Sequence, residues 1–191
     1  MISKLSQKIT EILCRLQLIE SEEQNLYFYG MFMVLSQTLF LIVALIFGLL
    51  FSSFWESFTF YVLFSSLRCY AGGIHASKEN TCTLYTVVAL FLSVVCIYAQ
   101  KSINNSFFSF VVLVVGSVVV YLLCPLDTED KPLTFTEVCQ YKRKSRLIVV
   151  GSLLIAIIAT FIHLEGILYA AATSLTLESI LLLLGTLKNR T

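Results

Sequence analysis

Six long apolar segments constrain the fold of this 191-residue chain more than any other feature. They cover approximately residues 26–51, 54–71, 83–100, 107–124, 147–163 and 166–187. Apolar runs of about 18 residues or more are typical of membrane-spanning helices. The chain is 58% hydrophobic and 13% charged with a mean hydropathy of +0.86, which excludes an ordinary water-soluble fold. We therefore predict an all-α polytopic membrane protein with six transmembrane helices.

The amino-terminal residues 1–25 form an amphipathic pattern rather than a continuous apolar run. The apolar positions, at alternating steps of three and four, are Ile2, Leu5, Ile9, Ile12, Leu16 and Ile19. We expect a helix lying in the membrane interface, and the alternative is a seam that binds an amphipathic partner peptide. Four glutamates and the lack of a short apolar core argue against a cleavable signal. The expected organisation is one membrane domain over residues 1–191, with the interfacial helix at 1–25 and the helical bundle at 26–187.

The distribution of Lys and Arg predicts the orientation of the six segments. With the amino terminus in the cytosol, every basic residue except Lys101 falls in a cytosolic stretch. Positive residues accumulate on the cytosolic side of bacterial membranes. We therefore expect a multi-pass protein of the cytoplasmic membrane with both termini and the loop 68–82 in the cytosol. The second segment, 54–71, is the weakest, because Ser52, Ser53 and Glu56 favour a hairpin of short or tilted helices over two upright ones.

The loop 68–82 is the place where a histidine, a cysteine, a glycine pair and charges converge. A Cys82 thiolate is a strong nucleophile, and a neutral His75 imidazole can take the thiol proton, which together suffice for acyl transfer. His163 falls at the outer end of the fifth segment, so it is expected across the bilayer. On one unbroken helix His75 and Cys82 would stand about 10.5 Å apart, too far for a working pair. We therefore expect the helix to break between them.

Residues around the pair suit such a break. Gly72 and Gly73 can end one helix, and Asn80 can cap the next. Cys82 would then lie in a first helical turn, where the positive end of the helix dipole favours a thiolate. Backbone amides beside Cys82, near the glycine turn, can form an oxyanion hole. Cys69, near the end of the preceding helix where the dipole has the wrong sign, is the second choice. The alternative is a flexible loop with a solvated His75 and an incidental Cys82.

The run from Arg68 to His75, followed seven residues later by Cys82, closely resembles the accessory gene regulator B family of Gram-positive bacteria. Chain length, the amphipathic amino end, the six segments and the stretch 125–132 are also similar to that family. The resemblance implies a membrane cysteine endopeptidase that cleaves a quorum-sensing, AgrD-like propeptide with an acidic tail. His75 and Cys82 map onto the catalytic pair, and Arg68 and Gly73 onto further motif residues.

The implied mechanism passes through a thioester on Cys82, which a Cys or Ser of the pheromone segment attacks to close a thiolactone or lactone ring. No ATP site, cofactor or metal is expected, and a homodimer is expected by family resemblance. A basic cluster can bind the acidic tail or simply anchor the fifth segment on the positive-inside side. Its members are Lys131, Lys142, Arg143 and Lys144, with Arg146 nearby.

Several functions and roles remain open from the sequence. Glu178 is an intramembrane acid expected to face the interior, with Gln37 as a possible partner, either for catalysis or for helix packing. The six cysteines (14, 69, 82, 96, 124 and 139) show no pattern of a disulfide framework or zinc site. Scattered basic residues argue against nucleic-acid binding. A small peptide transporter is the main alternative function, and a structural membrane scaffold is the third.

Overall fold

The structure is a computed structural model that describes residues 2–72, 79–126 and 134–188. Every regular element in these residues is helical. The elements are α1 (Ile2–Arg15), the 3₁₀ turn η1 (Ser21–Glu23), α2 (Gln24–Leu50), α3 (Phe54–Ala71), α4 (Glu79–Ile103), α5 (Ser106–Leu123), α6 (Phe135–Phe161) and α7 (Glu165–Lys188). The predicted all-α class is confirmed, and each of the six apolar segments corresponds to one helix from α2 to α7.

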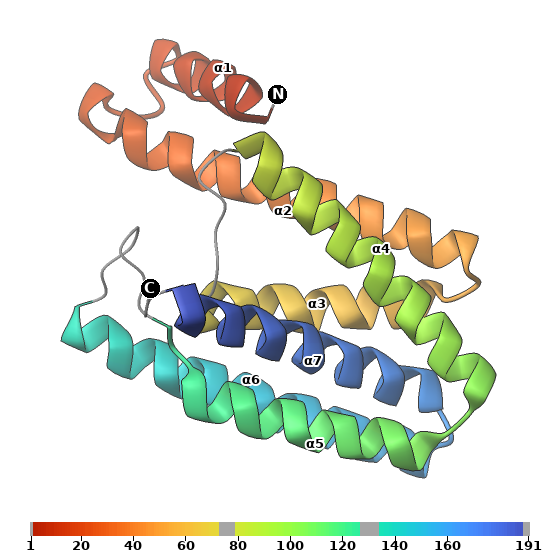
Figure 1. The fold of residues 1–191 in the computed structure, drawn as a ribbon. Coiled ribbons are helices and arrows are strands. Elements are labelled where there is room, and N and C mark those ends of the chain that lie inside the picture. The colour runs from red at the N-terminus through yellow and green to blue at the C-terminus, as the bar shows by residue number, and fades with distance from the viewer. Residues whose placement is uncertain (1, 73–78, 127–133, 189–191) are drawn as a thin grey trace. The chain divides into compact units, whose positions relative to one another are not determined.

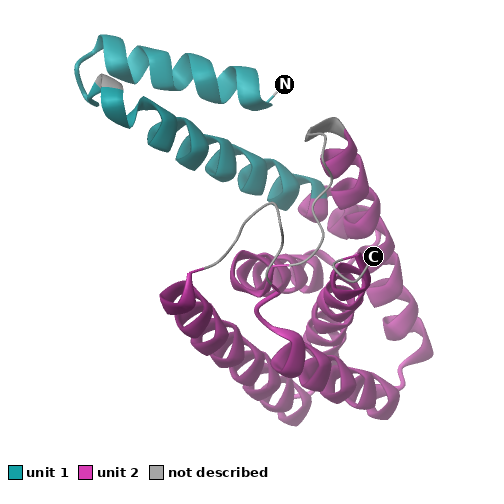
Figure 2. Cartoon of the chain, turned by 60° about the vertical axis from the view of Figure 1, so that its left-hand side comes forward, with its two compact units in different colours: residues 1–43 teal, residues 44–191 magenta. Residues whose placement is uncertain are grey.

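The chain forms two compact units, residues 1–43 and residues 44–191 (Figure 2). The first unit contains α1 and most of α2. The predicted amphipathic helix is present as α1, and its apolar residues Leu5 and Ile12 are about half exposed. Exposed apolar side chains on a helix with a charged opposite face suit a position in the membrane interface. The single membrane domain over 1–191 stays a prediction.

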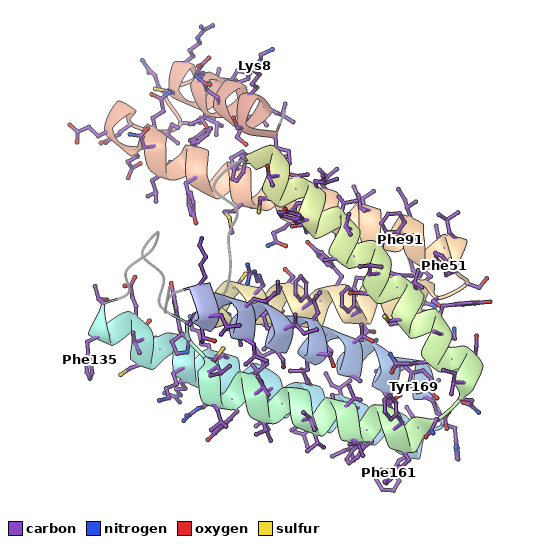
Figure 3. All side chains as sticks on the ribbon, viewed as in Figure 1. Lys8, Phe51, Phe91, Phe135, Phe161 and Tyr169 are labelled. Atoms are coloured by element: carbon purple, nitrogen blue, oxygen red, sulfur yellow. The ribbon has the colours of Figure 1, made fainter. Side chains whose placement is uncertain are left out.

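Helix α7 is the centre of the second unit. It packs against α3, α4, α5 and α6, and half of its residues are buried (Figure 1). Small side chains such as Ala171 and Ser174 let neighbouring helices approach closely, as is usual in membrane bundles. The hydroxyl of Ser179 donates a hydrogen bond to the Gly116 carbonyl of α5 at 3.0 Å. In contrast, Phe135 and Phe161 of α6 point away from the bundle (Figure 3) and are more than four-fifths exposed, as expected for lipid-facing side chains.

Five of the helices, α2, α4, α5, α6 and α7, are long and apolar enough to cross a membrane. The sixth, α3, is not among them, in line with its being the weakest predicted segment. Its residues Phe60, Phe64 and Leu67 are buried against α6 and α7 instead. The chain is therefore a multi-pass membrane protein by composition, whereas the arrangement of six complete spans stays a prediction.

Short turns gather at one end of the second unit. The turns between α2 and α3, α4 and α5, and α6 and α7 all lie there (Figure 1). Lys101 from the end of α4 donates to the Ser52 carbonyl at 3.2 Å and forms an ion pair of 2.6 Å with Glu56. The basic residue that the sequence places outside the cell therefore has its charge balanced by an acid. His163 lies in the α6–α7 turn at this same end.

Helix α6 begins twelve residues before the apolar segment predicted at 147–163. Its start is a capping box: the Thr134 hydroxyl accepts from the Glu137 amide at 3.4 Å, and the Glu137 carboxylate accepts from the Thr134 amide at 2.9 Å. The basic run 142–144 thus lies within a helix rather than in a loop before it. Hydropathy alone does not indicate this start, because the first turns of α6 are polar.

Candidate functional site

The motif singled out in the sequence falls where α3 ends and α4 begins. Arg68 to Ala71 form the last turn of α3, Gly72 follows it, and α4 starts at Glu79. Because α4 begins at Glu79, after His75 in the sequence, the prediction that one unbroken helix does not carry both His75 and Cys82 is confirmed. Gly73, His75 and Lys131 lie outside the described residues, so their predicted roles stay predictions.

Cys82 is the fourth residue of α4 and is half-buried. Its predicted place in the first helical turn is confirmed. The helix starts at Glu79, two residues earlier than an Asn80 cap implies, so Asn80 is the second helical residue rather than the cap. Cys82 still lies at the positive end of the helix dipole, which extends over the first turn.

Two other cysteines near this end of the second unit are poorer nucleophiles. Cys69 is exposed in the last turn of α3, where the negative end of the dipole opposes a thiolate. Cys124 follows α5 and is only 4% exposed. Burial raises the pKa of the Cys124 thiol to about 12, so this thiol stays protonated near neutral pH. Among Cys69, Cys82 and Cys124, Cys82 is the one that combines access with a helix amino end.

Gly72 fixes how the chain leaves α3. Its φ is +81° and its ψ is −143°, a conformation that side chains with a Cβ rarely adopt. A Cβ at this position would lie 2.6 Å from the Leu126 carbonyl oxygen. The Leu126 amide in turn donates to the Ala71 carbonyl at 2.9 Å. The segment after α5 is therefore fastened to the end of α3, and only glycine fits at the junction.

Arg68 fastens the same junction from within α3. Its Nη1 donates a hydrogen bond to the carbonyl oxygen of Gly72, four residues later. The last carbonyls of a helix lack intrahelical partners, so a guanidinium here satisfies one of them and suits the negative end of the dipole. The sequence identified Arg68 through the family motif but gave no contact for it. The four-residue spacing to a helix-ending glycine is the signal that points to this hydrogen bond.

The basic turn of α6 lies beside the motif. Lys142, Arg143 and Lys144 are exposed, and the Lys144 ammonium stands 4.9 Å from the centre of the Tyr70 ring. Tyr70 belongs to the motif turn of α3, and its ring also contacts the Tyr141 ring edge-on at 5.8 Å. Lys142 and Arg143 also line a shallow surface pocket of about 440 Å³. Exposed positive charge thus lies next to the end of α3.

Comparison with known proteins identifies the family of this chain. The sequence profile described as "Accessory gene regulator B" matches residues 3–182. This chain belongs to that family. Membership implies a membrane peptidase that processes the precursor of an autoinducing peptide, with an AgrD-like propeptide as its substrate. The predicted family resemblance is confirmed over nearly the whole chain.

Two curated relatives from Clostridium perfringens are similar to the chain. A "Putative AgrB-like protein" from strain SM101 / Type A is 29% identical over 179 residues. A "Putative AgrB-like protein 2" from strain 13 / Type A is 28% identical over 173 residues. Each alignment covers 88% of this chain and 78% of the relative. No solved structure matches the chain significantly.

Proposed function

We propose that this family member is a membrane cysteine endopeptidase in which Cys82 is the nucleophile and His75 is its base. The observation that carries the proposal is the place of Cys82, half-buried in the first turn of α4 and directly after the segment that holds His75. A helix amino end lowers the cost of forming a thiolate, and an imidazole seven residues earlier can accept its proton. Asn80, Gly72 and Gly73 lie close to the pair in the sequence, and we expect them to support it or to supply oxyanion contacts.

The chemistry proceeds as acyl transfer. The Cys82 thiolate attacks the carbonyl carbon of the peptide bond before the acidic tail, and the carbon–nitrogen bond breaks. The leaving amine takes its proton from the His75 imidazolium, so the tail departs with a neutral amino terminus. The leader and pheromone remain on Cys82 as a thioester. A thiol or hydroxyl of the pheromone segment then attacks this thioester, which closes a thiolactone or lactone ring and releases the Cys82 thiol.

The basic turn of α6 supplies the contact for the acidic tail. Lys142, Arg143 and Lys144 are exposed beside the motif, so a polyanionic segment can reach them without displacing packed side chains. We expect Lys131, which precedes α6 in the sequence, to contribute to the same contact. Diffuse positive charge acts mainly on encounter with a charged partner, so we expect it to influence KM more than kcat. The reaction takes place on the cytosolic side of the membrane, where the propeptide is synthesised.

The test is a cleavage assay with protein in nanodiscs and synthetic propeptides. Wild-type protein should give a covalent adduct on Cys82 by mass spectrometry. We expect Cys82→Ala and His75→Ala to abolish cleavage while both proteins still insert and accumulate. The double variant should be hardly worse than either single one, because nucleophile and base act as a unit. Cys69→Ser is the matched control and should keep most activity, whereas tail release by Cys82→Ala at a wild-type rate would refute the mechanism.

A further inference from the structure

Glu178 is a buried acid that the proposed mechanism leaves unused. It lies on the central helix α7 and its side chain is completely buried. Neither of its carboxylate oxygens accepts a hydrogen bond from the residues that the structure describes. Burying an ionisable group inside a membrane bundle is costly, and such groups usually face a partner charge or a functional site. The buried serines and threonines of α7 instead donate hydrogen bonds from their hydroxyls to backbone carbonyls. A carboxylate has no proton to donate in this way.

The charged neighbour of Glu178 is Arg68 of the motif. Arg68 Nη1 lies 4.0 Å from Glu178 Oε1, and the Arg68 side chain is itself only 18% exposed. The Cys124 thiol after α5 also lies within electrostatic reach of the carboxylate. The sequence hypothesis paired Glu178 with Gln37, which belongs to the first compact unit. Within the second unit, the acid faces Arg68.

The contacts form a continuous series from α7 to the exit of α3. Glu178 stands beside the Arg68 guanidinium, and the same Nη1 atom donates to the Gly72 carbonyl. A guanidinium is a rigid planar fork, so a charge beside it restricts the direction of its N–H groups. Gly72 comes three residues before His75 in the sequence. Arg68 therefore holds the carbonyl of the last described residue before the segment that carries the proposed base.

We propose that Glu178 is a positioning residue of the peptidase site. Its buried carboxylate orients the Arg68 guanidinium, and Arg68 holds the Gly72 carbonyl and thereby the start of the segment that carries His75. This inference rests on the proposed function, because it assigns Glu178 a role in the alignment of His75 with Cys82. Glu178 is completely buried, whereas Lys142, Arg143 and Lys144 of the basic turn of α6 are exposed. Loss of Glu178 should therefore lower kcat and leave the affinity for the acidic tail unchanged.

The experiment is a double-mutant cycle on the full-length protein in nanodiscs, with a synthetic propeptide that carries the acidic tail. We expect Glu178→Gln to lower kcat by about 10- to 100-fold, the size of effect that small misplacements of catalytic groups produce, with KM unchanged. Arg68→Gln should lower kcat at least as much. The combination of both changes should be no worse than Arg68→Gln alone, because Glu178 acts through Arg68. The rate at which iodoacetamide labels Cys82 should fall in parallel.

Two further variants separate positioning from folding. Ser174→Ala removes a fully buried polar group one turn earlier on α7 and should leave kcat unchanged. Arg68→Lys keeps a positive charge beside Glu178 but lacks the planar fork, so it should fold like the wild type and still lose kcat. Wild-type kcat in Glu178→Gln or Arg68→Lys, or independent losses that multiply in the double variant, would overturn the inference. A Cys82→Ala protein that still cleaves the propeptide would instead overturn the proposed function.

Discussion

Replacing Gly72 with alanine is a direct test of how the exit of α3 is built. A residue with a Cβ held at φ +81° and ψ −143° costs about 1–3 kcal/mol in backbone strain. The new Cβ would also lie 2.6 Å from the Leu126 carbonyl oxygen, a separation that real Cβ atoms essentially never show. Together these effects disfavour the native junction by about 3 kcal/mol, which corresponds to a population roughly 100-fold smaller. We therefore expect Gly72→Ala to cleave the propeptide about 100-fold more slowly.

The assay is propeptide cleavage at saturating substrate, together with thermal unfolding in detergent. Gly151→Ala is the matched control, because a Cβ at this α6 position meets no atom within 4 Å. Alanine is favoured over glycine inside a helix, so the control should be as stable as the wild type or more so. If Gly72→Ala cleaved at the wild-type rate, neither the strained glycine nor its contact with Leu126 would be needed for activity.

Three further predictions concern the rest of the second unit. Neutralising residues 142–144 together should raise the KM for the propeptide and weaken the salt dependence of that KM, measured by cleavage assays at low and high ionic strength. An unchanged KM would mean that these residues act only as a membrane anchor. Glu56→Gln should lower stability by about 1 kcal/mol or less in thermal unfolding, because the Lys101–Glu56 pair is partly exposed, and should leave kcat intact. A cysteine introduced at Ser77 in a cysteine-free background should resist an impermeant thiol reagent on intact cells, and its labelling would reverse the proposed orientation.

The sequence was sufficient for the elements whose cause is local. Apolar length and composition predicted the helices α2 to α7, and the alternating three-and-four spacing predicted α1. The need to bring His75 near Cys82 predicted a helix break, which the structure has between Ala71 and Glu79. These features depend on side-chain hydrophobicity and helix periodicity, both of which can be read along a single segment.

Local signals also explain where the sequence reasoning was inaccurate. Helix α6 starts twelve residues before the predicted apolar segment, because the capping box of Thr134 and Glu137 sets its start and hydropathy does not. The cap of α4 was predicted two residues late, since Asn80 is a good capping residue but the helix already begins at Glu79. Polar helical turns before a membrane segment carry no apolar signal, so their limits depend on capping chemistry.

Only the tertiary structure decided which distant residues meet. Sequence patterns marked Arg68 and Glu178 separately, yet α3 and α7 bring their side chains to 4.0 Å. Likewise, the contact of Gly72 with Leu126 joins two loops that are more than fifty residues apart. Amino-acid composition determines which helices form, because each apolar residue of a long segment is stabilised by contact with lipid. The packing of several helices around α7 sets which polar groups share the interior, and no single segment contains that information.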